Sequence, residues 1–167
     1  FHTEAVQAAG HLSINVQRDN IDMLSLSAHK FHGPKGIGLL FAKSNIQLTS
    51  LIRGGGQERG KRAGTENLPS IIGLATALKD AQEHMQQNTA YITGLRDALR
   101  NGLDKIDGAG FNGSREHCLP GTVNYSFQGV NGETLLSLLS NEGICCSSGS
   151  ACSAAVSYTH LTLPTKL

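Results

Sequence analysis

Hydrophobic and polar residues alternate along this chain in patterns that predict short strands and longer helices. Short apolar runs or strict alternation predict strands at 1–3, 12–16, 21–26, 37–42, 122–127 and 144–147. Apolar residues recur at helical spacing in segments that we predict to be helices, 69–86, 91–103 and 135–143. Residues 4–7 and 107–113 are predicted to be loops. The pattern therefore predicts an α/β protein, with a boundary between two parts near residues 87–89.

Composition narrows the class of protein. The chain has 167 residues, a formal net charge of +1 and 16% charged residues, which argues against nucleic-acid binding. No apolar run reaches the roughly 18 residues of a membrane span. The four cysteines include no CxxC pair, and the seven histidines offer no metal-ligand spacing, so a zinc site is disfavoured. Reduced thiols in a cytoplasmic protein are the better interpretation.

The central stretch is SAHKFHGPKG at residues 27–36. It places Ser27, His29 and Lys30 where a buried strand ends, just before a turn forced by glycine and proline. Schiff-base chemistry requires a lysine amine without its proton, and burial or a nearby cation favours that form. The alternative is that Lys30 and Lys35 are ordinary surface lysines beside a turn.

Two further stretches have the composition of a binding or catalytic loop. RGGGQERGKRAGT at 53–65 combines five glycines with four cations, and its backbone amides, with the Thr65 hydroxyl, suit an anion. It lacks the GK[ST] ending of a Walker loop, and a solvated surface loop is the alternative. CSSGSACS at 146–153 carries Cys152 among small polar residues. That setting suits a nucleophilic thiol, whereas burial as a small hydrophobe is the alternative.

Taken in order, four motifs resemble the cysteine desulfurases of the NifS/IscS type, in the class V branch of type I pyridoxal-phosphate enzymes. They are HTxAVQ, SxHKxxGPKG, RGGGQERGxRxGTEN and SSGSACS, and the resemblance covers residues 1–155. It implies the C-terminal part of a type I pyridoxal-phosphate-dependent transferase fold. Residues 1–88 would be the C-terminal part of the cofactor-binding large domain, truncated at its start. Residues 89–155 would be an incomplete small α+β domain, and 156–167 a non-native tail.

The resemblance also implies a role for each matching residue. Lys30 would be the Schiff-base lysine of pyridoxal 5'-phosphate. His29 and Ser27 would contact the cofactor, Ser27 at its phosphate. Gln7 would bind the phenolic oxygen of its ring, and Glu4 would pair with the pyridinium nitrogen.

The resemblance implies that two residues interact with a second protein chain. Thr65 would contact the cofactor phosphate of the neighbouring subunit, which makes the enzyme a homodimer. Cys152 would take sulfur from L-cysteine as a persulfide and pass it to an iron–sulfur scaffold or another acceptor protein. In relatives that serve a scaffold, the same cysteine can touch a nascent iron–sulfur cluster, the one metal contact that we expect.

The chain departs from the family pattern in three places. Glu4 stands where the family usually has Asp, and its side chain is one methylene longer. The main phosphate loop and the ring-stacking histidine, which precede this region in the family, are not in the sequence. The tail VSYTHLTLPTKL carries neither the expected helix nor the arginine that binds the substrate carboxylate.

The sequence therefore predicts a parent enzyme that converts L-cysteine to L-alanine and an enzyme persulfide. The alternatives are another class V enzyme, such as a selenocysteine lyase or an aminotransferase-like relative, or a fragment that is non-catalytic as it stands. The serine-rich loop around Cys152 argues against the first alternative, because an aminotransferase needs no mobile thiol.

Overall fold

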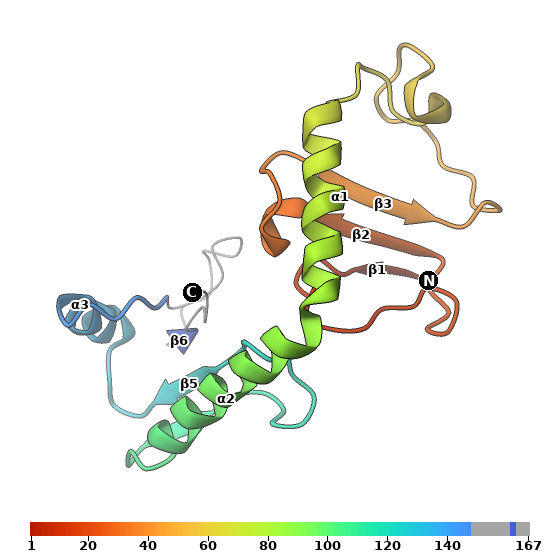
Figure 1. The fold of residues 1–167 in the computed structure, drawn as a ribbon. Helices are drawn as coiled ribbons and strands as arrows, with labels where there is room; N and C mark the ends of the chain where they lie inside the picture. The colour runs from red at the N-terminus through yellow and green to blue at the C-terminus, as the bar shows by residue number, and fades with distance from the viewer. Residues whose placement is uncertain (148–160, 163–167) are drawn as a thin grey trace. The chain divides into compact units, whose positions relative to one another are not determined.

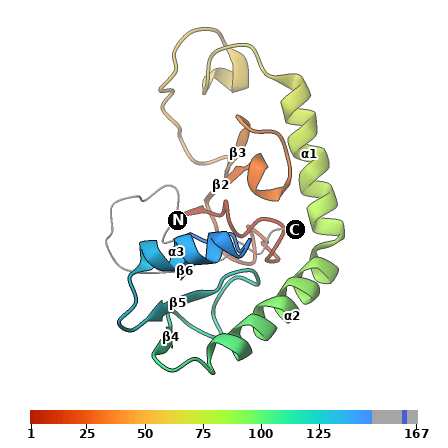
Figure 2. The ribbon, with the colours of Figure 1, turned by 90° about the vertical axis from the view of Figure 1, so that its left-hand side faces the viewer.

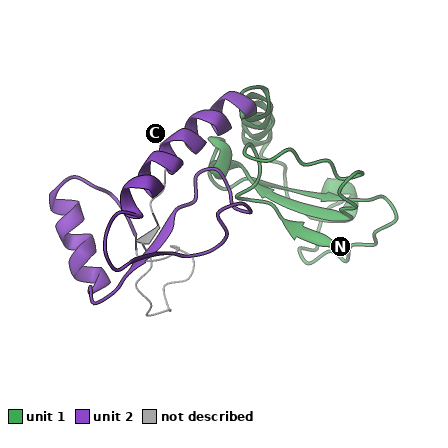
Figure 3. Ribbon diagram, turned by 90° about the horizontal axis from the view of Figure 1, so that it is seen from below, with its two compact units in different colours: residues 1–85 green, residues 86–167 purple. Residues whose placement is uncertain are grey.

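The computed structural model describes residues 1–147 and 161–162. The chain divides into two compact units, Phe1–Met85 and Gln86–Leu167 (Figure 3). The elements of the first unit are β1 (His2–Glu4), β2 (Met23–Ser27), η1 (Ala28–Phe31), β3 (Gly38–Ala42), η2 (Gln57–Gly60) and α1 (Leu68–Glu83). The later elements are α2 (Met85–Leu103), β4 (Ala109–Phe111), β5 (Asn124–Phe127), α3 (Gly132–Asn141) and β6 (Leu161–Thr162). Figure 1 labels most of them.

The first unit is a three-stranded sheet in the order β1-β2-β3, with α1 beside it (Figures 1 and 2). β1 pairs with β2 in parallel and β3 pairs with β2 antiparallel. Leu24 and Leu26 point to one face of β2, and Ser25 and Ser27 point to the other. The apolar face is the core side, because Leu24 is only 5% exposed and Leu26 packs against the buried cluster that includes Leu74 of α1.

The predicted strand at 12–16 is wrong. This segment consists of turns and irregular backbone. The Asn15 side-chain oxygen accepts hydrogen bonds from the backbone N–H groups of Gln17 and Arg18, each at 3.0 Å. Local side-chain bonds of this kind compete with strand pairing. The alternating residues Ile14 and Val16 nevertheless pack against the second buried cluster of the unit.

The short 3-10 helix η1 follows β2 directly and is held by its apolar residues. Ala28 is fully buried and Phe31 is 3% exposed, and both pack with Leu74. The Gly33 N–H donates to the Ala28 carbonyl at 2.8 Å. A Cβ on Gly33 would approach the Ala28 Cβ to 2.8 Å, so glycine is required for this tight turn. The buried Ala28 and Phe31 fix the backbone of the two residues between them, His29 and Lys30.

α1 begins as predicted and depends on a glycine where it meets the turn after η1. Its N-cap is Asn67, whose side chain accepts a hydrogen bond from the Ser70 N–H at 3.3 Å. A Cβ on Gly73 would lie 2.7 Å from Pro34 Cγ, so the bare Gly73 backbone allows close approach. The helix thereby supports the GPKG turn that follows the predicted lysine site.

We expect Gly73→Ala to lower the free energy of unfolding by about 1–3 kcal/mol, because an overpacked contact must be relieved at the rigid Pro34 ring. Gly94→Ala on α2 is the matched control, since nothing lies within 4 Å of its added Cβ. That control should raise stability by roughly 0.5–1 kcal/mol. Urea titration of both variants checks this, and equal behaviour of the two would contradict the packing described.

The second unit pairs β4, β5 and β6 as an antiparallel sheet. β4 lies within the segment 107–113, which the sequence predicted to be a loop. α3 is capped by Asn131, and Gly143 follows its C-terminal end with φ +77°, as predicted for a C-cap glycine. The strand predicted at 144–147 is wrong, because only Ser147 forms a bridge there.

A polar network anchors β5 to α2. The hydroxyl of the buried Tyr125 donates to Asp104 at 2.6 Å, and Arg115 donates to both Asp104 carboxylate oxygens at 2.8 and 2.9 Å. These bonds, Arg115 first and then Tyr125, lower the pKa of Asp104 to about 2. Tyr125 also packs edge-on against Phe111 with ring centroids 5.5 Å apart. The network fixes the end of α2 against the sheet.

The junction between the two long helices comes earlier than predicted. α1 ends at Glu83, and its C-cap His84 donates a backbone N–H to the Asp80 carbonyl. α2 then begins at Met85, whereas the sequence predicted a first helix to residue 86 and a second helix from residue 91. No helix in the described part of the chain combines the length and apolar character that crossing a bilayer requires.

Candidate functional site

The predicted site lies where two parallel strands end side by side. Glu4, the last residue of β1, is in register with Ser25 of β2, and Ala5 N–H donates to the Ser25 carbonyl at 3.0 Å. Because side chains alternate along a strand, His2, Glu4, Ser25 and Ser27 share the face opposite the apolar core. The carboxyl ends of β1 and β2 thus carry a row of polar groups.

Sequence reasoning missed two members of this row. Ser25 Oγ and His2 Nε2 lie 3.2 Å apart, within hydrogen-bond distance. The period-of-two alternation through His2 and Glu4 was the available signal. The predicted loop at 4–7 is wrong for Glu4, because this residue is the end of β1.

Ser27 and His29 form a pair at the end of β2. Ser27 Oγ lies 2.9 Å from His29 Nδ1, so the two side chains orient each other. Ser27 is half-buried and His29 is exposed. The pair therefore presents an imidazole toward solvent from a position fixed by the strand and by η1.

Lys30 follows His29 on η1 and is half-buried. Within residues 1–147 and 161–162 its amine forms no hydrogen bond or ion pair, so no carboxylate holds it. Lys35 differs, because it is exposed in the turn between Pro34 and Gly36. Of the two lysines in the motif, Lys30 is the half-buried one, and its backbone is fixed between the buried Ala28 and Phe31.

The Glu4 carboxylate is oriented by its own loop. Its Oε1 accepts a hydrogen bond from the Val6 N–H at 2.8 Å, and the side chain remains exposed. Gln7 is exposed in the turns that follow, which begin where the Ala8 and Ala9 N–H groups donate to the Ala5 carbonyl. Glu4 can therefore accept a second donor through its other oxygen.

Thr65 lies apart from this group, exposed in the loop between η2 and α1. The loop is closed by hydrogen bonds from Gly64 N–H to the Gln57 side chain and from Ala63 N–H to the Ile52 carbonyl, both at 3.1 Å. Glu58 and Arg59 both adopt positive φ, 49° and 58°. The structure brings Glu4, Ser27, His29 and Lys30 to one sheet edge and places Thr65 on a separate loop.

Cys152 lies outside the described residues, and of the predicted tail 156–167 only β6 (Leu161–Thr162) is described. The adjacent cysteines that precede Cys152 are described. Cys145 is exposed, and Cys146 is half-buried. Burial, followed by the charge of Cys145, raises the pKa of the Cys146 thiol. Cys146 is thus a poor nucleophile at neutral pH.

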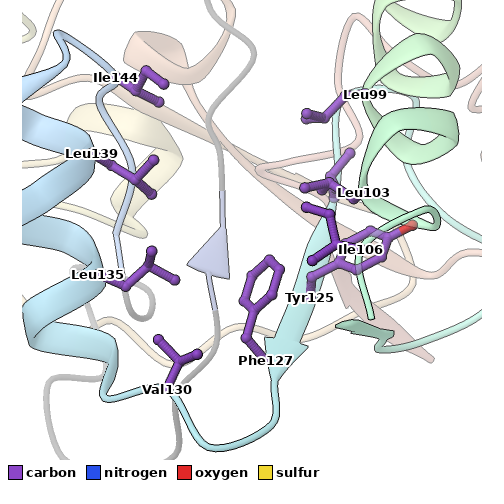
Figure 4. A pocket seen from close by; sticks show the side chains of 10 residues that line it. Leu99, Leu103, Ile106, Tyr125, Phe127, Val130, Leu135, Leu139 and Ile144 are labelled. Carbon is purple, nitrogen blue, oxygen red and sulfur yellow. The ribbon is translucent and has the colours of Figure 1, made fainter. Parts of the chain in front are cut away.

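The second unit holds an apolar hollow that does not suit a charged cofactor. It has a volume of about 350 Å³ and is lined by side chains of α2, β5, α3 and their neighbours, including Leu103, Phe127 and Leu139 (Figure 4). A charged ligand there would lose its hydration without polar partners.

In the described part of the chain, there is no group of three or more His, Cys, Asp or Glu side chains that could hold a metal ion.

The sheet-edge residues fit pyridoxal phosphate by their chemistry. Lys30, a half-buried residue whose amine has no partner among the described residues, can bind its carbonyl carbon. The Ser27 hydroxyl can donate to phosphate, and the oriented Glu4 carboxylate can pair with a ring nitrogen. The exposed face of His29 can contact the ring. Glu4 ends β1 and Ser27 ends the adjacent β2, and His29 and Lys30 follow Ser27 directly on η1.

Comparisons with known proteins agree on the protein family to which this chain is similar. A family model described as aminotransferase class-V matches residues 1–166. The chain is 49% identical over 155 residues to a cysteine desulfurase of Gluconacetobacter diazotrophicus, covering 92% of this chain and 39% of that protein. It is 48% identical over 167 residues to the cysteine desulfurase IscS of Clostridium botulinum, covering 98% and 42%.

A solved structure titled NifS-like protein superposes with a TM-score of 0.87 at 36% identity, covering 98% of this chain and 46% of that one. The chain spans about two fifths of the length of the curated relatives it matches.

Proposed function

The chain belongs to the class-V aminotransferase family, and we propose that the full-length protein is a pyridoxal-phosphate-dependent cysteine desulfurase. The matches confirm the α/β fold class and the resemblance to desulfurases of the NifS/IscS type that the motifs indicated. Support for the activity comes above all from one observation. The half-buried Lys30, whose amine has no partner in the part of the chain that the structure describes, follows the Ser27–His29 pair on a fixed turn.

Residues 1–88 are proposed as part of the cofactor-binding domain and 89–155 as part of the small domain. Residues 156–167 are proposed as a non-native tail. Thr65, on its exposed loop, suits contact with the phosphate bound by a second subunit of a homodimer. The compartment proposed is the cytoplasm.

In the proposed mechanism, bound pyridoxal phosphate supplies an electrophilic carbon for amines and a ring that accepts electrons. Lys30 would hold the cofactor through Nζ, and its free amine would accept the proton from the substrate Cα. The Ser27 hydroxyl would donate to the phosphate, and the Gln7 side chain would donate to the phenolic oxygen. Glu4 pairs with the ring nitrogen through a charge-assisted hydrogen bond.

Cys152 carries the sulfur. Its thiolate attacks the sulfur of bound L-cysteine, so that an S–S bond forms as the substrate C–S bond breaks. The products are L-alanine and a persulfide on Cys152, which an acceptor protein such as an iron–sulfur scaffold then receives. Any iron contact of Cys152 belongs to that delivery step.

Incubating the full-length protein with pyridoxal phosphate, L-cysteine and a thiol reductant tests this function. The expected products are alanine and sulfide in equal amounts. A keto acid without sulfide would favour an aminotransferase-like relative, and preference for selenocysteine would favour a lyase of that type. The 167-residue chain alone is expected to be inactive, because it covers about two fifths of its relatives.

Glu4→Gln in the full-length protein should lower turnover by one to two orders of magnitude, at roughly 1.4 kcal/mol per decade. The amide keeps the size of the side chain and removes the charge that pairs with the ring nitrogen. Glu83→Gln is the control, because that carboxylate lies exposed on α1 beside Lys79. Steady-state sulfide release measures both, and unchanged turnover in Glu4→Gln would mean that Glu4 does not touch the ring.

A further inference from the structure

A free thiol in the second unit lies between two guanidinium groups. Arg100 Nη2 donates to Cys118 Sγ at 3.2 Å, and Arg96 Nη1 donates to the same sulfur at 3.7 Å. Both arginines come from α2, whereas Cys118 lies on the loop between β4 and β5. None of the three residues belongs to the proposed cofactor or persulfide machinery.

Positive charge is in excess around this sulfur. Arg100 is only 5% exposed, and among the described residues its one ion pair is with Asp97 Oδ1, 3.9 Å from Nη1. The same oxygen lies 2.8 Å from Arg96 Nε, so two cations share one half-exposed carboxylate. The pKa of Arg96 is raised, first by its hydrogen bond to Asp97 and also by the charge of the Cys118 sulfur.

Arg100 also has an unused donor. Its Nε is buried and has no hydrogen-bond partner among the described residues. Its other contacts are the Thr122 carbonyl at 3.4 Å and the face of the Phe111 ring, 4.6 Å from the ring centroid. A buried guanidinium with so little counter-charge is costly, and an anion at the Cys118 sulfur would offset that cost.

The neighbouring charges do not cancel this excess. Arg115 also stacks on Phe111, but Asp104 neutralises it through a bidentate pair. The Arg115 backbone carbonyl lies 3.8 Å from Cys118 Sγ and can accept the proton of a neutral thiol. Cys118 is half-buried, so small reagents can reach it.

We propose that Cys118 is a redox-modification site, which a hydroperoxide oxidises to a sulfenate held by Arg96 and Arg100. The Cys118 thiolate attacks one peroxide oxygen, so that an S–O bond forms and the O–O bond breaks. Sulfur loses two electrons, and the other peroxide oxygen leaves as hydroxide. That hydroxide takes the proton of the new sulfenic acid, so the products are the Cys118 sulfenate and one water molecule. The product keeps a negative charge beside the two guanidinium groups, which stabilise it by charge-assisted hydrogen bonds. This site goes beyond the desulfurase function and needs neither Lys30 nor Cys152.

The test uses the full-length protein loaded with its cofactor. The protein is exposed to equimolar hydrogen peroxide in the presence of dimedone, which traps sulfenic acids, and peptide fragmentation locates the label. Cys118 should be labelled about tenfold faster than the more exposed Cys145, because two guanidinium groups donate to the Cys118 sulfur and stabilise the charged product. Cys118→Ala should lose that label and keep its sulfide release.

Arg96→Gln should slow labelling of Cys118 by about tenfold and leave Cys145 unchanged. Arg115→Gln is the matched control, since it removes a nearby guanidinium that does not donate to the sulfur, and it should change the rate less than about twofold. Arg100→Gln should act like Arg96→Gln if circular dichroism shows that it folds, and otherwise Arg96→Gln alone decides. Equal labelling of Cys118 and Cys145, or an unaffected Arg96→Gln, would overturn the proposal.

Discussion

Lys30→Ala in the full-length protein is expected to abolish covalent attachment of pyridoxal phosphate and to cut sulfide release by at least about 10²–10⁴-fold, the range for a lost general base. The expectation rests on position. Ala28 and Phe31 anchor η1 in the core and hold the half-buried Lys30 between them, beside the Ser27–His29 pair. Borohydride reduction, which fixes the cofactor to its lysine, followed by peptide mapping measures the attachment.

Lys35→Ala is the matched control for this experiment. Lys35 has the same side chain in the same motif, but it is exposed in the turn after Pro34. It should keep the cofactor and most of the activity. A reduced cofactor on Lys35, or full activity in Lys30→Ala, would show that the assignment of the lysine is wrong.

Cys152→Ala should bind pyridoxal phosphate and L-cysteine normally and yet release almost no sulfide, a loss of about 10³-fold or more. Lys30 and the other cofactor ligands are unchanged in this variant, so the cofactor absorbance should still respond to substrate. The change removes only the nucleophile that receives the sulfur. Stopped-flow absorbance and a sulfide assay on the same sample separate the two steps.

The adjacent cysteines provide the controls. Cys145→Ala and Cys146→Ala should each retain sulfide release. Burial raises the pKa of Cys146, which makes it a weaker nucleophile at neutral pH. If either variant were as inactive as Cys152→Ala, the persulfide would have been assigned to the wrong residue.

Local signals predicted much of the first unit. Asn67 and Pro69 marked the start of α1, and the structure shows the expected cap bond to Ser70 N–H. The apolar runs gave β2 and β3, and the polar cluster that follows β2 lies where a strand end was expected. These features are set by residues close in sequence, so they can be predicted without knowing the fold.

The failures came where a local bond or a distant contact decided the structure. Alternation at 12–16 looked like a strand, but the Asn15 side chain bonds its own backbone and makes turns. β4 lies in a segment that was predicted to be a loop. The sequence did not indicate this strand, because it is formed by pairing with β5, which lies further along the chain. Arg100 and Cys118 are 18 residues apart in the sequence, and no rule of sequence spacing predicts that they are in contact.

The most direct test of the desulfurase proposal is mass spectrometry of the full-length protein after one turnover with L-cysteine carrying heavy sulfur. The account predicts one heavy sulfur atom on the peptide that contains Cys152, one equivalent of L-alanine, and no sulfur on Cys118, Cys145 or Cys146. A labelled persulfide on Cys146, or alanine formed with no sulfur bound to the protein, would contradict it.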